Sequence, residues 1–182
     1  MKHPFLIIFA LCLNITAYCQ DESAIYIKII DEYPLKYKQP STKKSFVTLI
    51  VLEVPLYLRK IEITEFSRFK ESYKKLDEKT FLDFIKKNQK STNMDNFKFP
   101  DVDIVVVNQE QSKRKKELLT MYPNWNHSIL EFSNIGFNEE KNQAFVYYGF
   151  DSGSLTAGGI YFILEKKKKK WKIKGYIPAW TT

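Results

Sequence analysis

The sequence predicts an α+β fold, with helices packed mainly on one face of an antiparallel sheet that ends in a four-stranded C-terminal meander. Phenylalanine and tyrosine recur at helical spacing in the middle of the chain. In the last third, runs rich in aromatic and β-branched residues alternate with short polar connections, which is typical of antiparallel strands. These four runs are Ser128–Phe137, Asn142–Phe150, Gly159–Glu165 and Trp171–Ile177. Helices and strands that are grouped separately along a chain indicate the α+β class.

The first elements after the N-terminal segment are a helix and a strand. Residues 22–33 have a capping serine, Ser23, and apolar spacings that predict a helix, although the isoleucines would also suit a strand. Residues 45–54 are apolar on both alternating faces and end before Pro55. This pattern predicts a strand that is buried on both sides.

Two helices, a short strand and a third helix are predicted next. Phe66, Phe69, Tyr73 and Leu76 share one helical face, and a second helix follows the capping candidate Asp77. Residues 103–108 predict a short strand, and residues 112–122 predict a helix that ends before Pro123. Aromatic residues at this spacing indicate core packing.

The N-terminal segment has the three regions of a secretory signal peptide. Lys2 is basic, Phe5–Leu13 is an unbroken apolar run, and Thr16–Cys19 resembles a cleavage region before Gln20. The apolar run is shorter than the roughly 18 residues that a permanent membrane anchor needs. We therefore expect residues 1–19 to be removed, leaving an exported, periplasmic or extracellular chain without a transmembrane segment.

The composition limits the classes of protein to which the chain can belong. The 182 residues carry a net charge of +8, and residues 20–182 contain no repeat or flexible linker, which indicates a single α+β domain. Both cysteines, Cys12 and Cys19, precede residue 20, which excludes a disulfide scaffold and thiol catalysis in the mature chain. The run Lys166–Lys170 supplies five of the basic residues, so the high isoelectric point comes largely from one segment.

Strand pairing predicts which loops share an end of the sheet. If Phe137 pairs near Gln143, antiparallel register places His127 beside Gly153. Residues 122–127 and 151–158 then lie at one end, and the acidic turn at 139–140 lies with the lysine run at the other.

The end that bears His127 is the principal candidate site. We expect a non-catalytic exported domain that binds a partner protein or small ligand through the loops around His127 and Asp151–Gly158. The candidate binding residues are Tyr122, Trp125, His127, Asp151, Ser152 and Ser154. Aromatic residues near connections suit a ligand groove, although they suit a filled core end equally well. No cofactor and no metal ligand set are expected, and the oligomeric state stays open.

Two alternatives use the same candidate residues or the lysine run. A small hydrolase would use His127 as base, Ser152 or Ser154 as nucleophile and Asp151 as the orienting carboxylate. Glycine, serine and aspartate are also what any turn needs, so the spacing favours a plain turn. An electrostatic binder of an anionic envelope surface would use Lys166, Lys167, Lys168, Lys169 and Lys170. Nucleic acid is disfavoured as a partner because the chain is expected to be exported. In addition, one aromatic residue beside the lysine run, Trp171, does not make a stacking platform for bases.

The C-terminal third also resembles a known family. The segments Phe132-Ser-Asn-Ile-Gly-Phe-Asn138, Gln143-Ala-Phe-Val-Tyr147 and Gly158-Gly-Ile-Tyr-Phe-Ile-Leu-Glu-Lys166 are similar to an uncharacterised family of small exported Bacteroidetes proteins. The resemblance covers mainly residues 117–182. It implies an exported α+β domain and no particular activity. By this resemblance, related sequences carry cysteines in the loop where this chain has Ser152 and Thr156. A thiol role of that loop therefore cannot operate here.

Overall fold

The computed structural model describes a central sheet, the helices that cover it and parts of their connections. The described residues are 22–32, 47–51, 58, 61–89, 104–107, 110, 113–121, 125–151 and 157–182. The predicted signal peptide, residues 1–19, lies outside them.

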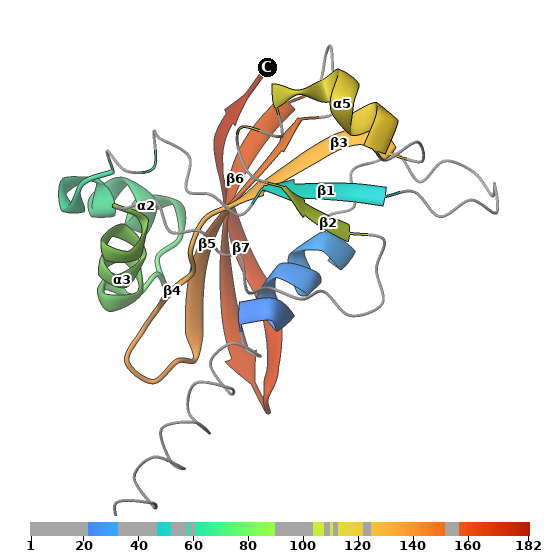
Figure 1. Ribbon diagram of the computed structural model, residues 1–182. Helices are drawn as coiled ribbons and strands as arrows, with labels where there is room; N and C mark the ends of the chain where they lie inside the picture. The colour runs from blue at the N-terminus through green and yellow to red at the C-terminus, as the bar shows by residue number, and fades with distance from the viewer. Residues whose placement is uncertain are drawn as a thin grey trace, which may run out of the picture.

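The strands form one mixed sheet (Figure 1). They are β1 (Val47–Val51), β2 (Ile104–Val107), β3 (Trp125–Phe132), β4 (Gly136–Phe137), β5 (Gln143–Asp151), β6 (Ala157–Lys167) and β7 (Lys170–Thr181). Their order is β2-β1-β3-β5-β6-β7, and the short β4 pairs with β5. All pairs from β3 to β7 are antiparallel, which confirms the α+β class and the C-terminal meander.

The strand β1 differs from the rest because both of its neighbours run parallel to it. Thr48 pairs with Ile104 of β2, and Leu49 pairs with Ile129 of β3. An interior parallel strand agrees with the apolar run of residues 45–54, since such strands are apolar on both faces.

The predicted helices form, with shifted ends. They cover residues 22–32, η2 (Ile63–Glu65), α2 (Phe66–Ser72), α3 (Glu78–Asn88) and α5 (Lys115–Met121). The carboxylate of Asp77 accepts a 2.8 Å hydrogen bond from the backbone N–H of Lys79, which confirms Asp77 as the N-cap of α3. The helix α2 ends sooner than the aromatic spacing predicts, because Tyr73 is extended. No helix of the described segments is long and apolar enough to span a bilayer.

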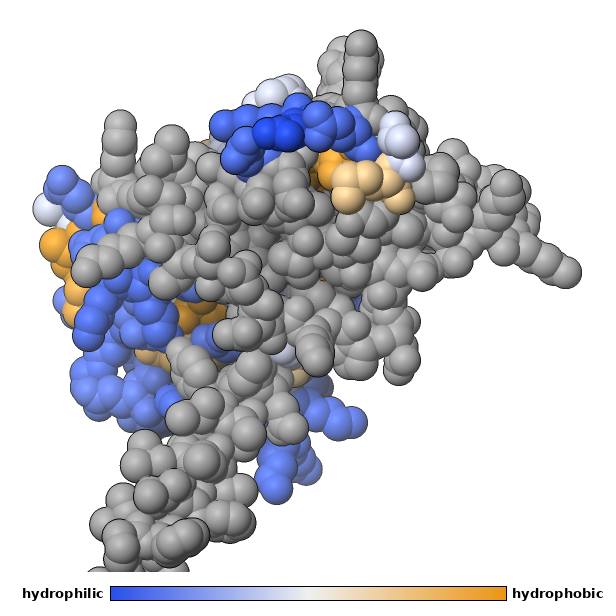
Figure 2. Space-filling view, in the orientation of Figure 1, coloured by the Kyte–Doolittle hydropathy of each residue, from blue (hydrophilic) through white to orange (hydrophobic). Residues whose placement is uncertain are grey.

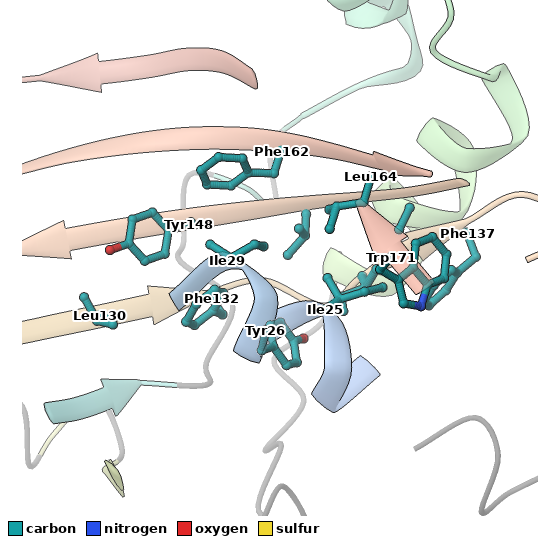
Figure 3. Packing of buried hydrophobic residues seen from close by; sticks show 13 residues of the cluster. Ile25, Tyr26, Ile29, Leu130, Phe132, Phe137, Tyr148, Phe162, Leu164 and Trp171 are labelled. Atoms are coloured by element: carbon teal, nitrogen blue, oxygen red, sulfur yellow. The ribbon is translucent and has the colours of Figure 1, made fainter. Parts of the chain in front are cut away.

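The sheet separates two apolar clusters. On one face, α2 and α3 place Phe69, Phe81 and Phe84 against Phe145 and Tyr161 of the sheet. On the other face, the helix over residues 22–32 contributes its own buried residues. Figure 3 shows Ile25, Tyr26 and Ile29 of that helix beside Phe132, Tyr148 and Phe162. Strand residues alternate between these faces, as the two-residue period requires.

The run predicted as one strand over residues 128–137 is interrupted between Phe132 and Gly136. The backbone N–H of Asn134 donates to Asn88 Oδ1 at 2.9 Å, and Asn88 Nδ2 donates to the Asn134 carbonyl at 3.0 Å. The end of α3 therefore supplies the hydrogen bonds that a neighbouring strand would otherwise supply. Pairing resumes at Gly136 with the register shifted by one residue.

Gln143 fixes the connection between α2 and α3 to the sheet. Its side chain accepts a 2.8 Å hydrogen bond from the backbone N–H of Asp77 and donates a 2.9 Å bond to the carbonyl of Lys75. Gln143 is buried, so these bonds form away from water. This clamp holds the start of α3 against the first residue of β5.

Candidate functional site

A groove of about 360 Å³ lies between α2 and the last residues of β7. It is lined by Ile61, Glu65, Arg68, Phe69, Ser72, Tyr161, Ile177, Pro178, Ala179 and Trp180. The volume is at the lower end of the range for small-molecule sites. Because Trp180 pairs with Gly159, the groove is near the end of the sheet at which the sequence predicts a site.

Aromatic rings form the floor of the groove. The rings of Phe69 and Tyr161 meet edge to face with centroids 5.0 Å apart, and Tyr161 stacks on Phe145 at 5.3 Å. Phe69 also packs on Phe81 of α3. Each ring is fixed by several others, so the floor is preformed.

The hydroxyl of Tyr161 is the polar group of this floor. Tyr161 is only 4% exposed, yet within the described residues its hydroxyl has no hydrogen-bond partner. Burial raises the pKa of Tyr161, and the neighbouring Tyr147 adds to the shift. The phenol therefore stays protonated at neutral pH and offers an O–H donor to whatever enters the groove.

Arg68 and Glu65 form the polar rim. The guanidinium of Arg68 lies 2.8 Å from the Glu65 carboxylate, one turn earlier on the helix, and 4.9 Å from the centroid of the Phe69 ring. The contact with Phe69 keeps the guanidinium over the aromatic floor. A single carboxylate leaves other guanidinium N–H groups for a ligand, since arginine has five such donors.

Trp180 closes one side of the groove. Its indole N–H donates a 3.1 Å hydrogen bond to the hydroxyl of Tyr147, although Trp180 itself is 39% exposed. Gly159 on the intervening strand leaves room for this bond: a Cβ there would lie 2.6 Å from the indole nitrogen and would also overlap the Tyr147 hydroxyl.

Two carboxylates lie next to this arrangement, on the same face of the sheet. Glu131 pairs with Gly149, and its Oε2 is 3.3 Å from the position that a Gly149 Cβ would occupy. Burial raises the pKa of Glu131, and the charge of Asp151 raises it further. Within the described segments, no group of three or more acidic, histidine or cysteine side chains is placed to hold a metal ion.

Two other hollows are less suited to a small ligand. One, of about 460 Å³, is lined largely by charged side chains of α3 and the β4–β5 turn, and its Lys79 and Glu139 already form an ion pair. The other, of about 650 Å³, lies beside Ile63 and Leu82. The described residues that line it carry no hydroxyl group.

The structure places the predicted binding residues only in part. Asp151 ends β5, opposite Ile129 on one side and Ala157 on the other. That pairing agrees with the register expected from the sequence. Trp125 and His127 belong to β3, but their side chains lie outside the described part, as do Tyr122, Ser152 and Ser154 altogether. The proximity of His127 to a serine therefore stays a prediction.

The lysine run lies at the opposite end of the sheet, as expected. Lys166 and Lys167 end β6, Lys168 and Lys169 form the turn, and Lys170 begins β7. The backbone N–H of Lys166 donates a 2.7 Å bond to the carbonyl of Asn142, which places the acidic turn of residues 139–140 at this end too.

Sequence reasoning missed the groove because it missed the convergence of Arg68, Tyr161 and Trp180. Tyr161 reads as an ordinary core residue, and Arg68 reads as an exposed helix residue paired with Glu65 at i and i+3. One signal was available: Tyr147 and Tyr161 lie in consecutive predicted strands, and the structure pairs them directly, which puts both phenols on one face of the sheet. The chain matches no family model, no curated protein and no solved structure.

Proposed function

We propose that this chain is an exported, non-catalytic binding domain whose groove between α2 and β7 takes a small, ring-bearing carboxylate. The observation that carries the proposal is the Tyr161 hydroxyl: a donor of a buried residue, without a partner among the described residues, at the floor of an aromatic groove. Within the described residues, Thr80 Oγ1 is the one fully buried side-chain polar atom without a hydrogen-bond partner, so the Tyr161 hydroxyl is open to the groove and can donate to a ligand atom there.

The chemistry of the ligand follows from its surroundings. Trp180, which is 39% exposed, offers accessible aromatic surface beside the buried rings of Phe69 and Tyr161, and this favours a planar or alicyclic ring. Arg68 and the Tyr161 hydroxyl are donors, and a carboxylate can accept from both. Charge-assisted bonds of this kind are roughly twice as strong as neutral ones.

Binding is favoured over catalysis at this groove. A general base must lose its proton near neutral pH, whereas the raised pKa of Tyr161 keeps its proton in place. The hydrolase alternative depends on His127, Ser152 and Ser154, and nothing in the groove adds to it.

The test uses ring-bearing carboxylates as probes: benzoate, 4-hydroxybenzoate, indole-3-acetate and cyclohexanecarboxylate. Titration of the ¹⁵N-labelled protein should shift the indole N–H signal of Trp180, which Trp180→Phe identifies among the three tryptophans. Tyr161→Phe removes only the hydroxyl and should weaken binding about tenfold, as expected for one lost hydrogen bond. Arg68→Gln should weaken the binding of the carboxylates more than the binding of benzamide, which has no charge.

Tyr176→Phe is the matched control, because Tyr176 is an exposed tyrosine of β7 on the opposite face of the sheet. It should leave the titration unchanged. The proposal is wrong if no probe shifts the Trp180 signal at millimolar concentration, or if Tyr161→Phe and Tyr176→Phe behave alike.

A further inference from the structure

The turn between β6 and β7 has an unfavourable sequence for its backbone. Lys167 pairs with Lys170, so the loop has two residues, Lys168 and Lys169, with φ angles of 48° and 64°. Positive φ at both positions is the signature of a type I′ turn, for which Asn-Gly is strongly preferred. Lysine has a Cβ that crowds the backbone in this region.

The lysines of this hairpin project into solvent from one end of the molecule. Lys167, Lys168, Lys169, Lys170, Lys172 and Lys174 are exposed. In the part of the chain that the structure describes, none of these six has a carboxylate within ion-pairing distance. Figure 1 shows the hairpin at the end of the sheet opposite the C-terminus, and Figure 2 shows hydrophilic side chains protruding there.

The base of the hairpin is anchored firmly. Trp171 is buried and packs against Phe137 with ring centroids 5.8 Å apart. The ammonium of Lys166 lies 5.5 Å from the centroid of the Trp171 ring. The aromatic residue of this end is thus turned into the core, and the exposed lysines stand on a rigid base.

We propose that this lysine hairpin docks the protein onto an anionic phospholipid membrane surface. Strained backbone that persists without a structural need is found preferentially at functional sites. Here the chain has two lysines in a strained turn, although Asn-Gly at these positions would give a more stable turn. Clusters of four to eight lysines near a membrane attract the anionic headgroups of its surface. The hairpin lies away from the groove, so the proposal does not depend on the proposed function.

The residue types favour a membrane over other anionic partners. Phosphopeptides are best recognised by the bidentate fork of arginine, and the hairpin contains none. Single-stranded nucleic acid needs several exposed aromatic platforms along a groove, whereas Trp171 is buried and Tyr176 is a single exposed ring farther along β7. A membrane requires only a compact set of point charges, since its headgroups rearrange around them.

The test pairs Lys168→Asn with Lys169→Gly in one variant, which restores the preferred turn while it removes two charges. We expect wild type to bind phosphatidylglycerol vesicles, to ignore phosphatidylcholine vesicles and to release at about 0.5 M NaCl, where charge screening is strong. The variant should keep or raise the melting temperature and weaken the salt-dependent binding at least ~tenfold. A loss of binding therefore cannot be attributed to unfolding.

Lys86→Gln with Lys113→Gln is the control, because it removes the same charge from two exposed lysines outside the hairpin. It should weaken binding less than threefold. Residues 5–13, if retained, add an apolar, salt-insensitive contribution that is equal in all variants, so the salt-dependent part is compared. Equal weakening by variant and control, no binding to anionic vesicles at low salt, or stronger binding to single-stranded DNA than to vesicles would overturn the proposal.

Discussion

The indole N–H of Trp180 donates a hydrogen bond to the Tyr147 hydroxyl across an entire strand. Tyr147 lies on β5 and Trp180 on β7, with β6 between them. The bond forms because Gly159 on β6 carries no side chain at the crossing point. This relationship fixes one wall of the groove, and it can be broken by a single methyl group.

Gly159→Ala should displace the Trp180 side chain and break its bond to Tyr147. Overpacking of this kind destabilises proteins by about 1 to 3 kcal/mol. Chemical denaturation measures the loss, and the Trp180 indole N–H signal reports the broken bond. Trp180→Phe removes the same bond without adding atoms and should destabilise less. A Gly159→Ala variant with an unchanged indole signal and unchanged stability would contradict this account.

Gly136→Ala should be more damaging because the nearest atoms include backbone. A Cβ at residue 136 would lie 2.5 Å from the Phe84 nitrogen and 2.5 Å from the Thr80 carbonyl oxygen. Neither atom can move without shifting α3. We expect a loss of about 3 kcal/mol in the free energy of unfolding. A loss under about 0.5 kcal/mol, as at an ordinary surface site, would show that α3 is not packed so closely on β4.

Asn88→Ala should destabilise the break between β3 and β4. It removes both hydrogen bonds to Asn134, and removal of one partner of a buried polar group costs about 1 to 3 kcal/mol. The neighbouring Gln89→Ala changes an exposed residue and should stay within about 0.5 kcal/mol of wild type. Equal effects of the two variants on urea denaturation would argue against a role for Asn88 in shaping the strand.

Glu131 should make the protein less stable as pH rises. Its folded pKa is raised by burial and by Asp151, so the folded state holds this proton more tightly than the unfolded state. Below the unfolded pKa of about 4.3 the proton is bound in both states, and as pH rises from there through the folded pKa the stability falls. Glu131→Gln should therefore be more stable than wild type at pH 7, with the difference shrinking toward pH 4 in thermal melts. A difference that grows on acidification would reverse the assignment.

Lys169→Gly should stabilise the hairpin, whereas Lys170→Gly should destabilise it. Lys169 has a φ of 64°, and glycine relieves about 1 kcal/mol of crowding there. Lys170 lies in β7, where glycine costs roughly 0.5 to 1 kcal/mol. The two substitutions should therefore change the free energy of unfolding, measured by chemical denaturation, in opposite directions. A change in the same direction for both would contradict the turn geometry.

Local patterns predicted the elements whose partners are near in the chain. The alternation of aromatic residues indicated the meander, and a constant sum of paired positions indicated the β3–β5 register, as the pairing of Ile129 with Asp151 confirms. The capping of α3 by Asp77 was equally local. In each case the deciding residues belong to one helix end or to strands that follow each other in the chain.

Features that depend on distant partners could not be predicted in this way. The interruption near Asn134 depends on Asn88 of α3, and the parallel pairing of β1 depends on strands far along the chain. The groove depends on which face of β6 receives Tyr161 and on where α2 lies against it. Periodicity gives the alternation of faces but not which helix covers each face.

The parallel position of β1 has a consequence for folding. The strands β5, β6 and β7 pair with immediate neighbours in the chain, whereas β1 must find β2 and β3 across long intervening segments. Non-local pairing pays loop-closure entropy before it gains contacts, so we expect β1 to dock last. Until it does, the edge of β3 and the apolar Val47–Val51 are open to other chains. The nascent protein is then most vulnerable to aggregation after its C-terminal meander has already formed.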